Sequence, residues 1–164
     1  MASRRKGRIL AFQALYFWES NREAEGVPVQ ELVSFAWLEE EKRACLDEDI
    51  AVFSRALIAG TVENIAEIDS MIMNHLENWD ITRLNRVDLA ILRISAYTLM
   101  FQSDIPPSIV IDEAIGISRE FGTDDSFRFI NGVLDSIRKT LKMSTLKMST
   151  QEQPQKQEAC VCGN

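Results

Sequence analysis

Four basic side chains crowd the first eight residues, and they are the strongest candidates for a binding chemistry in this sequence. The segment carries no acidic residue, and its basic members are Arg4, Arg5, Lys6 and Arg8. The planar guanidinium of arginine donates paired hydrogen bonds to phosphate oxygens and base edges, and a basic end of this kind can fold on contact with RNA. Solvated basic termini are also common, so the cluster alone leaves RNA binding and an idle terminus open.

Aromatic side chains that suit RNA occur in two places. Tyr16 and Trp18 follow the basic cluster, and an aromatic ring near a basic end can stack on an unpaired base. The second place is FGTDDSFRF, residues 121–129, where phenylalanines crowd around one expected helix joint. The same residues equally suit a packed core in which Asp124 or Asp125 caps a helix. Spacing does not decide between these two interpretations.

The sequence lacks the usual parts of an active site. Its single histidine, His75, lies near an expected helix end, where a structural or surface position is commoner than a catalytic one. Asp112-Glu113 and Asp124-Asp125 are adjacent pairs, and neighbours on a helix point about 100° apart and do not converge. No Glu-x-x-His, glycine-rich phosphate loop or Gly-x-Ser-x-Gly motif is present. We therefore predict that the protein is not an enzyme and uses no cofactor.

The cysteines predict no disulfide framework. Cys45 stands alone, and Cys160 and Cys162 lie in a polar tail. A Cys-x-Cys pair can bind a soft metal, but no matching cysteine or histidine pair occurs elsewhere. An idle tail without metal is therefore the expected state.

Charge and hydropathy limit which ligands and which cellular compartment the sequence fits. The net charge is −7, yet residues 1–8 carry four basic side chains, whereas residues 9–140 carry 11 basic and 23 acidic ones. One small basic patch on an acidic body indicates a local binding site rather than a general DNA-coating surface. No apolar run reaches the roughly 18–20 uncharged residues of a membrane helix, so no membrane association is predicted. The basic-then-apolar start resembles a signal peptide, but Gln13 and Glu19 interrupt it and no cleavage site follows, which favours the cytoplasm.

Helical periodicity covers almost every segment between residues 5 and 141, without a hairpin signal. In the first segment Ile9, Phe12, Leu15 and Tyr16 share one face. A second helix is expected over residues 27–41, with Pro28 in its first turn. A third is expected over residues 47–76, capped by Asp47 and bent at Gly60.

Three further segments complete the expected fold. A central helix is predicted over residues 86–102 after a short stretch at 80–85, and the next helix is expected to start at Pro107 and to end at Gly122 in a left-handed cap. The last helix takes up residues 126–141. The helical domain is therefore expected to comprise residues 1–141. The polar stretch 142–164, which repeats LKMST at 141–145 and 146–150, is expected to be a disordered tail, although the first repeat could extend the last helix.

Three blocks of the sequence resemble the NusB family. RRKGRILAFQALYFWE is similar to its arginine-rich start, RVDLAILRISAYTL to its central helix, and IPPSIVIDEAIGISREFGTDDSFRFINGVLDSI to its most characteristic block. The match runs in order over residues 4–139. Lys6-Gly7 departs from members that carry more arginine or alanine there, and glycine weakens a helix by about 1 kcal/mol relative to alanine.

The resemblance implies an all-α fold of two three-helix bundles. It also implies a transcription antitermination factor that binds boxA RNA together with ribosomal protein NusE in the antitermination complex of RNA polymerase, and some members form homodimers. Asp88 matches an acidic position on the face that meets NusE, and it is expected to be exposed. The positions that match the family's RNA-binding segments are Arg4, Arg5, Lys6, Arg8, Gln13, Tyr16, Asp125, Ser126, Arg128 and Phe129.

Two other functions fit part of the sequence. A helical protein–protein scaffold would have the same periodicity, with an incidental basic end. The fold also resembles the N-terminal domain of some ribosomal RNA cytosine methyltransferases, but those proteins carry a much longer catalytic half. Binding of boxA RNA, measured with and without NusE, separates the first alternative from an antitermination factor.

The basic cluster and Phe129 are expected to act as one RNA surface. If Arg4, Arg5, Lys6 and Arg8 neutralise four RNA phosphates, the slope of log affinity against log salt should be about −3, because each contact with a single strand contributes roughly 0.7 to the slope. Filter binding over a range of salt measures this slope. A slope near zero would contradict phosphate binding by the basic end.

Overall fold

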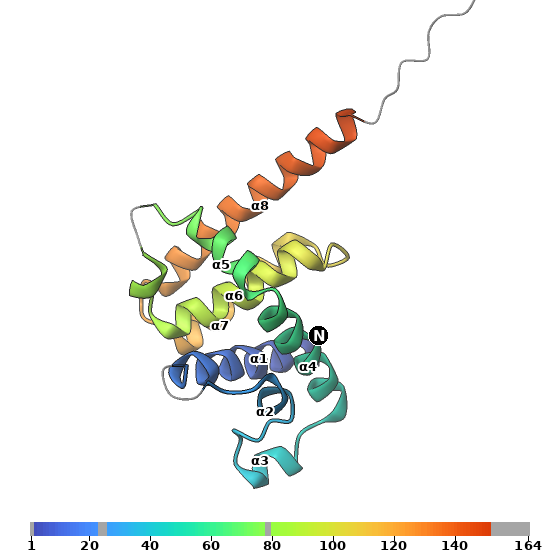
Figure 1. Cartoon of the computed structure of the whole chain (residues 1–164), viewed down its shortest axis with the longest axis vertical. Helices are drawn as coiled ribbons and strands as arrows, with labels where there is room; N and C mark the ends of the chain where they lie inside the picture. Colours follow the sequence, from blue (N-terminus) through green and yellow to red (C-terminus); the bar gives the residue numbers. More distant parts are fainter. Residues whose placement is uncertain (1, 23–25, 78–79, 152–164) are drawn as a thin grey trace, which may run out of the picture.

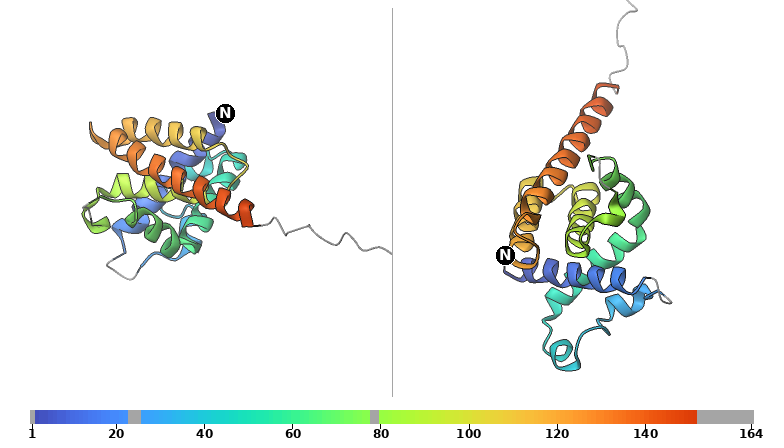
Figure 2. Two further views of the ribbon diagram at one scale, coloured as in Figure 1. Left: turned by 90° about the horizontal axis from the view of Figure 1, so that it is seen from above. Right: turned by 90° about the vertical axis from the view of Figure 1, so that its left-hand side faces the viewer.

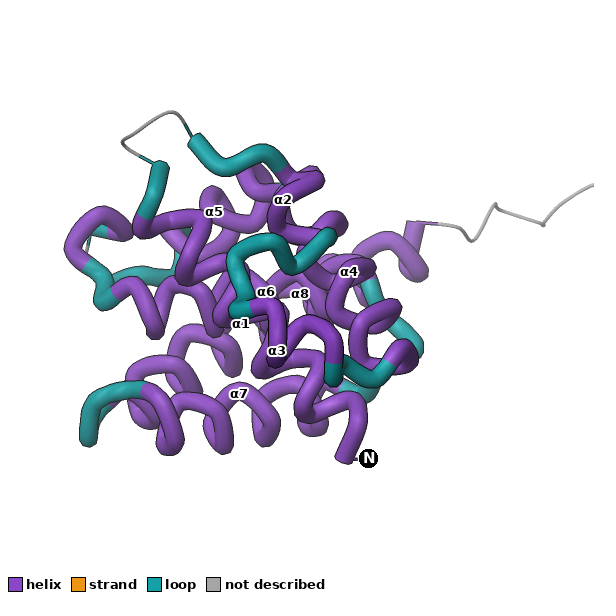
Figure 3. The backbone as a smooth tube through the Cα atoms, turned by 90° about the horizontal axis from the view of Figure 1, so that it is seen from below, coloured by secondary structure: helices purple, strands orange, loops and turns teal. Residues whose placement is uncertain are grey.

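The structure is a computed structural model that describes residues 2–22, 26–77 and 80–151. In these ranges the regular structure is entirely helical, as predicted (Figure 3). None of the described helices is long and apolar enough to cross a membrane. The elements are α1 (Ala2–Ser20), α2 (Val29–Val33), α3 (Glu40–Ala44), α4 (Glu48–Glu63), α5 (Ile65–Met73), the 3-10 helix η1 (Ile81–Arg83), α6 (Arg86–Phe101), α7 (Pro107–Phe121) and α8 (Ser126–Gln151).

The helices form two groups that meet along α1 and α6 (Figure 1). Helices α1, α2 and α4 pack together, and α6, α7 and α8 form the second group with α5 alongside. Helix α6 contacts members of both groups, and every residue from Asp88 to Ala96 is buried. A helix that is buried all round belongs in the centre of a fold. The predicted central helix and the predicted pair of three-helix groups are confirmed in outline.

The long helices expected over residues 27–41 and 47–76 are each divided in two. In the first, Phe35 adopts a positive φ of 57°, which ends the helical path between α2 and α3. In the second, the division between α4 and α5 falls at Asn64, with φ −107° and ψ 17°, and not at Gly60. Gly60 has a different role, because a Cβ atom there would lie 2.1 Å from Oη of Tyr97. The predicted cap is confirmed, since Asp47 accepts hydrogen bonds from two backbone amides of α4.

The end of α7 also differs from the prediction. Gly122 has φ −90° and ψ −170°, so the expected left-handed cap is wrong. Glycine fits this position for a steric reason instead. A Cβ atom would lie 2.6 Å from the carbonyl oxygen of Ser118 and 2.7 Å from Cβ of Ser126. The absence of a side chain therefore lets α8 turn back closely against α7.

Helix α8 continues past the expected boundary of the domain. Leu141 still packs against the core, whereas Met143 and Leu146 are 58% and 59% exposed. Helix α8 continues over residues 142–151, as the allowance for the first repeat anticipated, and its end projects beyond the other helices (Figure 1). The boundary of the packed domain at Leu141 stays a prediction, and the remainder of the expected tail, residues 152–164, lies outside the described residues.

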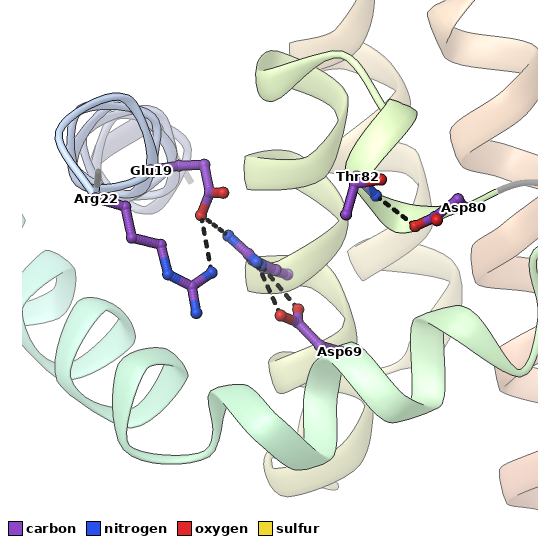
Figure 4. A network of polar contacts seen from close by, with 6 residues as sticks. Glu19, Arg22, Asp69, Asp80 and Thr82 are labelled. Carbon is purple, nitrogen blue, oxygen red and sulfur yellow. Dashed lines mark hydrogen bonds and ion pairs between the residues drawn. The ribbon is translucent and has the colours of Figure 1, made fainter.

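A buried arginine joins α1 to the second group of helices (Figure 4). The Arg93 side chain on α6 is 3% exposed and lies between carboxylates of two other helices. Its Nε and Nη2 each donate to Asp69 of α5 at 2.8 Å, and its Nη1 donates to Glu19 of α1 at 2.7 Å. Its guanidinium also lies 5.8 Å from the ring centre of Trp18.

The two carboxylates make this burial tolerable. Burial lowers the pKa of Arg93, but the hydrogen bonds and charges of Asp69 and Glu19 outweigh that effect, so the pKa is raised above its ordinary value. Three of the five N–H donors of the guanidinium bond to these two carboxylates. Removal of either acid would leave a buried charge only partly compensated.

Asp69→Asn should therefore lower the free energy of unfolding by about 3–5 kcal/mol, the usual cost of breaking a buried ion pair. Urea unfolding measures the loss. The matched control is Glu48→Gln, which breaks an exposed ion pair with Arg55 and should cost no more than about 1 kcal/mol. Equal small losses in both variants would contradict a special role for the buried arginine.

Candidate nucleic-acid interface

One face of α1 presents polar and aromatic side chains to solvent. Lys6, Gln13 and Tyr16 lie seven and three residues apart, a spacing that places them on one side of a helix. Lys6 is exposed, Gln13 is half-buried and Tyr16 is 41% exposed. The opposite face is held in the core by side chains such as Leu15. The helix starts at Ala2, so these side chains stand on a folded element rather than on a terminus that must fold first.

Arg4 and Arg5 differ in their surroundings. Arg4 is exposed and forms no salt bridge with any residue in the described ranges. Arg5 reaches α7, where its guanidinium lies 3.5 Å from Glu113 and 3.1 Å from Glu120. It passes over Gly116, where a Cβ atom would lie 2.7 Å from Nη1 of Arg5. Arg5 therefore ties the start of α1 to α7, and its charge is already balanced.

Arg8 is buried, which corrects the expectation of four phosphate-facing charges. It is 8% exposed, and its guanidinium lies 5.5 Å from the ring centre of Phe53 on α4. Burial lowers its pKa, and the nearby carboxylate of Glu113 partly opposes this shift. In this structure Arg8 supports the packing of α1 and does not face a phosphate at the surface.

The glycine next to Arg8 has a packing role that the sequence did not reveal. A Cβ atom on Gly7 would lie 2.5 Å from Cδ1 of Phe53, and the Ser54 hydroxyl donates to the Gly7 carbonyl at 2.9 Å. The weaker helix propensity of glycine is therefore accompanied by a close approach of α1 to α4.

An aromatic groove lies beside the polar face of α1. Its volume is about 560 Å³, and it opens between α1, the end of α7 and the segment around α3. Phe121, 36% exposed, forms part of its wall and packs 5.0 Å from Phe12, ring centre to ring centre. Such a groove next to basic side chains suits an unpaired base, because every base offers a flat face for stacking. The lining residues are Phe12, Gln13, Tyr16, Phe17, Trp37, Leu38, Lys42, Val87 and Phe121.

The expected RNA-facing residues at the start of α8 divide between surface and interior. Asp125 and Arg128 are exposed, and Nη1 of Arg128 lies 3.7 Å from Oδ1 of Asp125. Ser126 is only 2% exposed, and its hydroxyl accepts a hydrogen bond from the Thr123 amide at 2.9 Å. Ser126 therefore closes the turn between α7 and α8 and is not available as a surface contact in this structure.

Phe129 lies apart from the basic end. It is half-buried against the core and lines a pocket of about 370 Å³ with His75, Leu76 and Glu77. None of the residues lining this pocket belongs to α1, so the structure does not bring Phe129 and the basic cluster together as one surface. His75 itself bridges two helices, with Nδ1 2.7 Å from the Met71 carbonyl and Nε2 2.9 Å from the Thr140 hydroxyl.

Asp88 is buried, so the expectation that it is exposed is wrong. It is 8% exposed, and its Oδ1 finds no hydrogen-bond partner within the described part of the chain. Burial raises the pKa of Asp88, and the Ser126 hydroxyl partly offsets this effect. A buried carboxylate at the joint between α6 and α8 fits a structural role. In this position its charge is not available for the expected contact with NusE.

Sequence reasoning missed one exposed basic residue beside this surface. Arg119 on α7 lies 4.7 Å from the ring centre of Phe127, and Arg128 lies 5.4 Å from the same centre. The charge of Arg119 was visible in the sequence, but its position beside α8 required the turn at Gly122. Among the described residues, no group of three or more histidine, cysteine or acidic side chains could hold a metal ion, and Cys160 and Cys162 lie outside these residues.

A family model described as the NusB family matches residues 5–139, which include the basic end, the groove and the start of α8. The chain belongs to the NusB family. Two relatives are the transcription antitermination protein NusB of Treponema pallidum (strain Nichols) and that of Geobacter sulfurreducens. The first is 53% identical over 137 residues, which are 84% of this chain and 93% of the relative. The second is 44% identical over 141 residues, or 86% of this chain and 97% of the relative.

Solved NusB structures share the fold. T. maritima NusB has a TM-score of 0.72 and 38% identity, with 83% of this chain and 90% of that chain covered. The antitermination factors NusB and NusE in complex with dsRNA include a chain with a TM-score of 0.73 and 31% identity, with 85% of this chain and 98% of that chain covered. These similarities confirm the all-helical NusB fold that the sequence predicted, and this family of transcription antitermination proteins agrees with the expected non-enzymatic function.

Asp88→Asn should stabilise the fold at neutral pH. Because burial raises the pKa of Asp88, folding becomes less favourable as pH rises through the range in which this carboxyl ionises. Asparagine removes the charge, so the gain in Tm should be larger at about pH 7.5 than at about pH 4.5. Thermal melting at both values measures the difference. A destabilised variant with the same loss at both values would show that ionisation of Asp88 does not oppose folding.

Proposed function

We propose that this chain is an RNA-binding transcription antitermination factor that binds boxA RNA together with ribosomal protein NusE. The relatives carry the name transcription antitermination protein, and one similar structure holds NusB, NusE and dsRNA. The observation that carries the proposal is the polar face of α1 beside the aromatic groove. There Lys6 offers charge, while Gln13 and Tyr16 offer a hydrogen-bonding amide and a ring, and Arg4 adds a second exposed charge near the start of the same helix.

The chemistry of this surface fits single-stranded RNA better than duplex. Unpaired bases expose both their flat faces and their hydrogen-bonding edges, and aromatic rings bind the former. Tyr16 and Phe121 present partly exposed rings in the groove. Lys42 also lines the groove, where it forms an exposed ion pair with Glu39 at 2.9 Å. The acidic body around this region disfavours binding of nucleic acid elsewhere, which restricts RNA to a small area.

Assembly with other proteins is part of the proposal. We expect the RNA-bound factor to join the antitermination complex of RNA polymerase in the cytoplasm, and a homodimer is an alternative assembly of the free protein. Asp88 was expected on the NusE face. Because it is buried, we expect it to shape that face through the position of α6 rather than to present its charge.

Filter binding with boxA RNA, with and without NusE, tests the proposed function. We expect the wild-type chain to bind the RNA, and NusE to increase the affinity. Binding of NusE without any RNA affinity would instead favour a protein–protein scaffold.

Tyr16→Ala should weaken boxA RNA binding by about 1–3 kcal/mol, the usual cost of losing one stacked base. Its effect on Tm should be small, because 41% of the residue is exposed. Phe101→Ala is the matched control, since this ring is 42% exposed and lies outside the groove. Fluorescence titration and thermal melting measure both quantities. Equal RNA affinity in Tyr16→Ala and wild type would remove this ring from the site.

A further inference from the structure

We propose that a groove between α8 and the turn from α6 to α7 binds an acidic, partly apolar peptide segment of a partner protein. The groove, which we call the α8 groove, has a volume of about 380 Å³. One wall is formed by the second half of α8. The other is formed by the turn and the start of α7, at Ser103, Ile105, Pro107 and Ser108. The α8 groove shares no lining residue with the aromatic groove beside α1.

The α8 wall continues the face of this helix that packs in the core. Arg138, Leu141, Lys142 and Thr145 line the groove at positions i, i+3, i+4 and i+7, which share one side of a helix. One turn earlier on that side, Leu134 is fully buried. Leu141 still packs against the core, whereas residues 142–147 are exposed. A helix face that runs on past its cover is suited to pack against a further segment.

The α8 groove is basic although the protein as a whole is acidic. No acidic residue lines it. The stretch 136–151 of α8 also lacks acidic residues, and its basic ones are Arg138, Lys139, Lys142 and Lys147. Arg138 pairs with Asp135, whereas Lys142 forms no ion pair within the part of the chain that the structure describes. Carboxylates of a bound segment would therefore meet a positive charge that no other group balances.

The start of α7 adds to this positive potential. Its cap position, Pro106, makes no side-chain hydrogen bond, and its first turn carries no acidic residue. The positive end of the helix dipole is therefore not offset by a charge of the same turn. Asp104 lies in the preceding turn but does not line the groove. Both walls thus favour an acidic occupant over a basic one.

The apolar part of the α8 groove favours a protein segment over RNA. Its apolar lining residues are Leu99, Ile105, Pro107 and Leu141, all aliphatic. They offer no aromatic ring on which a base could stack, in contrast to the groove beside α1. Leucine or isoleucine side chains of a peptide can pack against such a surface, while flanking carboxylates meet the basic rim.

The α8 groove and the aromatic groove lie at opposite ends of α7. The α8 groove includes its start at Pro107, whereas the aromatic groove includes Phe121 at its end. A helix of this length spans roughly 20 Å at 1.5 Å per residue. The extended end of α8 leads away from α1 (Figure 2, right). Leu141, Lys142 and Thr145 also follow residue 139, where the match to the family model ends. Peptide and RNA can therefore bind at the same time.

Selection from a phage-displayed library of random peptides on the full-length protein tests this proposal. We expect the enriched sequences to combine Asp or Glu with Leu or Ile. A synthetic peptide of the enriched sequence should bind more weakly as salt rises, because ions screen its contacts with exposed charges. Enrichment of basic sequences, or no enrichment at all, would contradict an acidic partner.

The repeat in α8 supplies a matched pair of charge reversals. Lys142 and Lys147 have the same local sequence, LKMST, and both are exposed. Five residues turn a helix by about 140° from its starting side, and only Lys142 lines the groove. Lys142→Glu should weaken binding of the selected peptide roughly five-fold, because an exposed attraction becomes a repulsion. Lys147→Glu should change it by less than about two-fold. Equal binding by the two variants would contradict the site.

A change on the opposite wall checks that both sides of the groove take part. Ser108→Glu places a carboxylate at the start of α7 and should also weaken peptide binding. Its Tm should not fall, because an acidic residue suits the first turn of a helix. Full peptide affinity in a folded Ser108→Glu variant would contradict the α8 groove. Thermal melting of every variant gives the folded fraction.

Other occupants of the groove give different results. Loss of boxA RNA affinity in Lys142→Glu but not in Lys147→Glu would show a nucleic-acid contact and contradict the proposal. Wild-type dimers in sedimentation that only Lys142→Glu abolishes would show a second copy in the groove, and contradict it equally. Peptide binding by a chain without affinity for boxA RNA would support the groove while contradicting the proposed function, so the two can fail separately.

Discussion

The buried guanidinium of Arg93 is the constraint on which the arrangement of the helices depends. Arg93 belongs to α6, and its N–H groups donate to Asp69 of α5 and Glu19 of α1 at 2.7–2.8 Å. A charge in the interior is tolerated only while its partners stay in place, so α1 cannot move away from α6 without exposing this group or leaving it unpaired. The interaction therefore contributes orientation more than net stability, because a hydrophobic replacement of similar size could fold equally well.

The shape of the proposed RNA surface depends on this constraint. Arg93 holds the end of α1, while Arg5 ties its start to α7 through Glu113 and Glu120. Between these two attachments the outer face of α1 carries Gln13 and Tyr16 on a rigid helix, next to the aromatic groove. A preformed surface of this kind loses little conformational entropy on binding. Binding strength can then come from a few exposed charges and rings on an otherwise acidic protein.

The sequence predicts the helices better than it predicts the site. Periodicity and proline placed α1, α6 and α7, and three motif blocks indicated the family. The burial of charged groups was harder to predict from the sequence, because it depends on side chains from other helices. Arg8 precedes Phe12 and Leu15 by four and seven residues, so its place on the apolar face could have been read from the sequence. The burial of Asp88 and the approach of Arg119 to Phe127 could not, because both depend on how α8 returns against α6 and α7.

Crosslinking with boxA RNA that carries photoreactive uridines, followed by mass spectrometry of the crosslinked peptides, tests the location of the RNA most directly. The account predicts crosslinks to the α1 peptide that contains Tyr16 and to the peptides at the end of α7 and the start of α8 that contain Phe121 and Phe127. Crosslinks confined to the pocket of His75 and Phe129 would contradict it, because they would place the RNA away from α1.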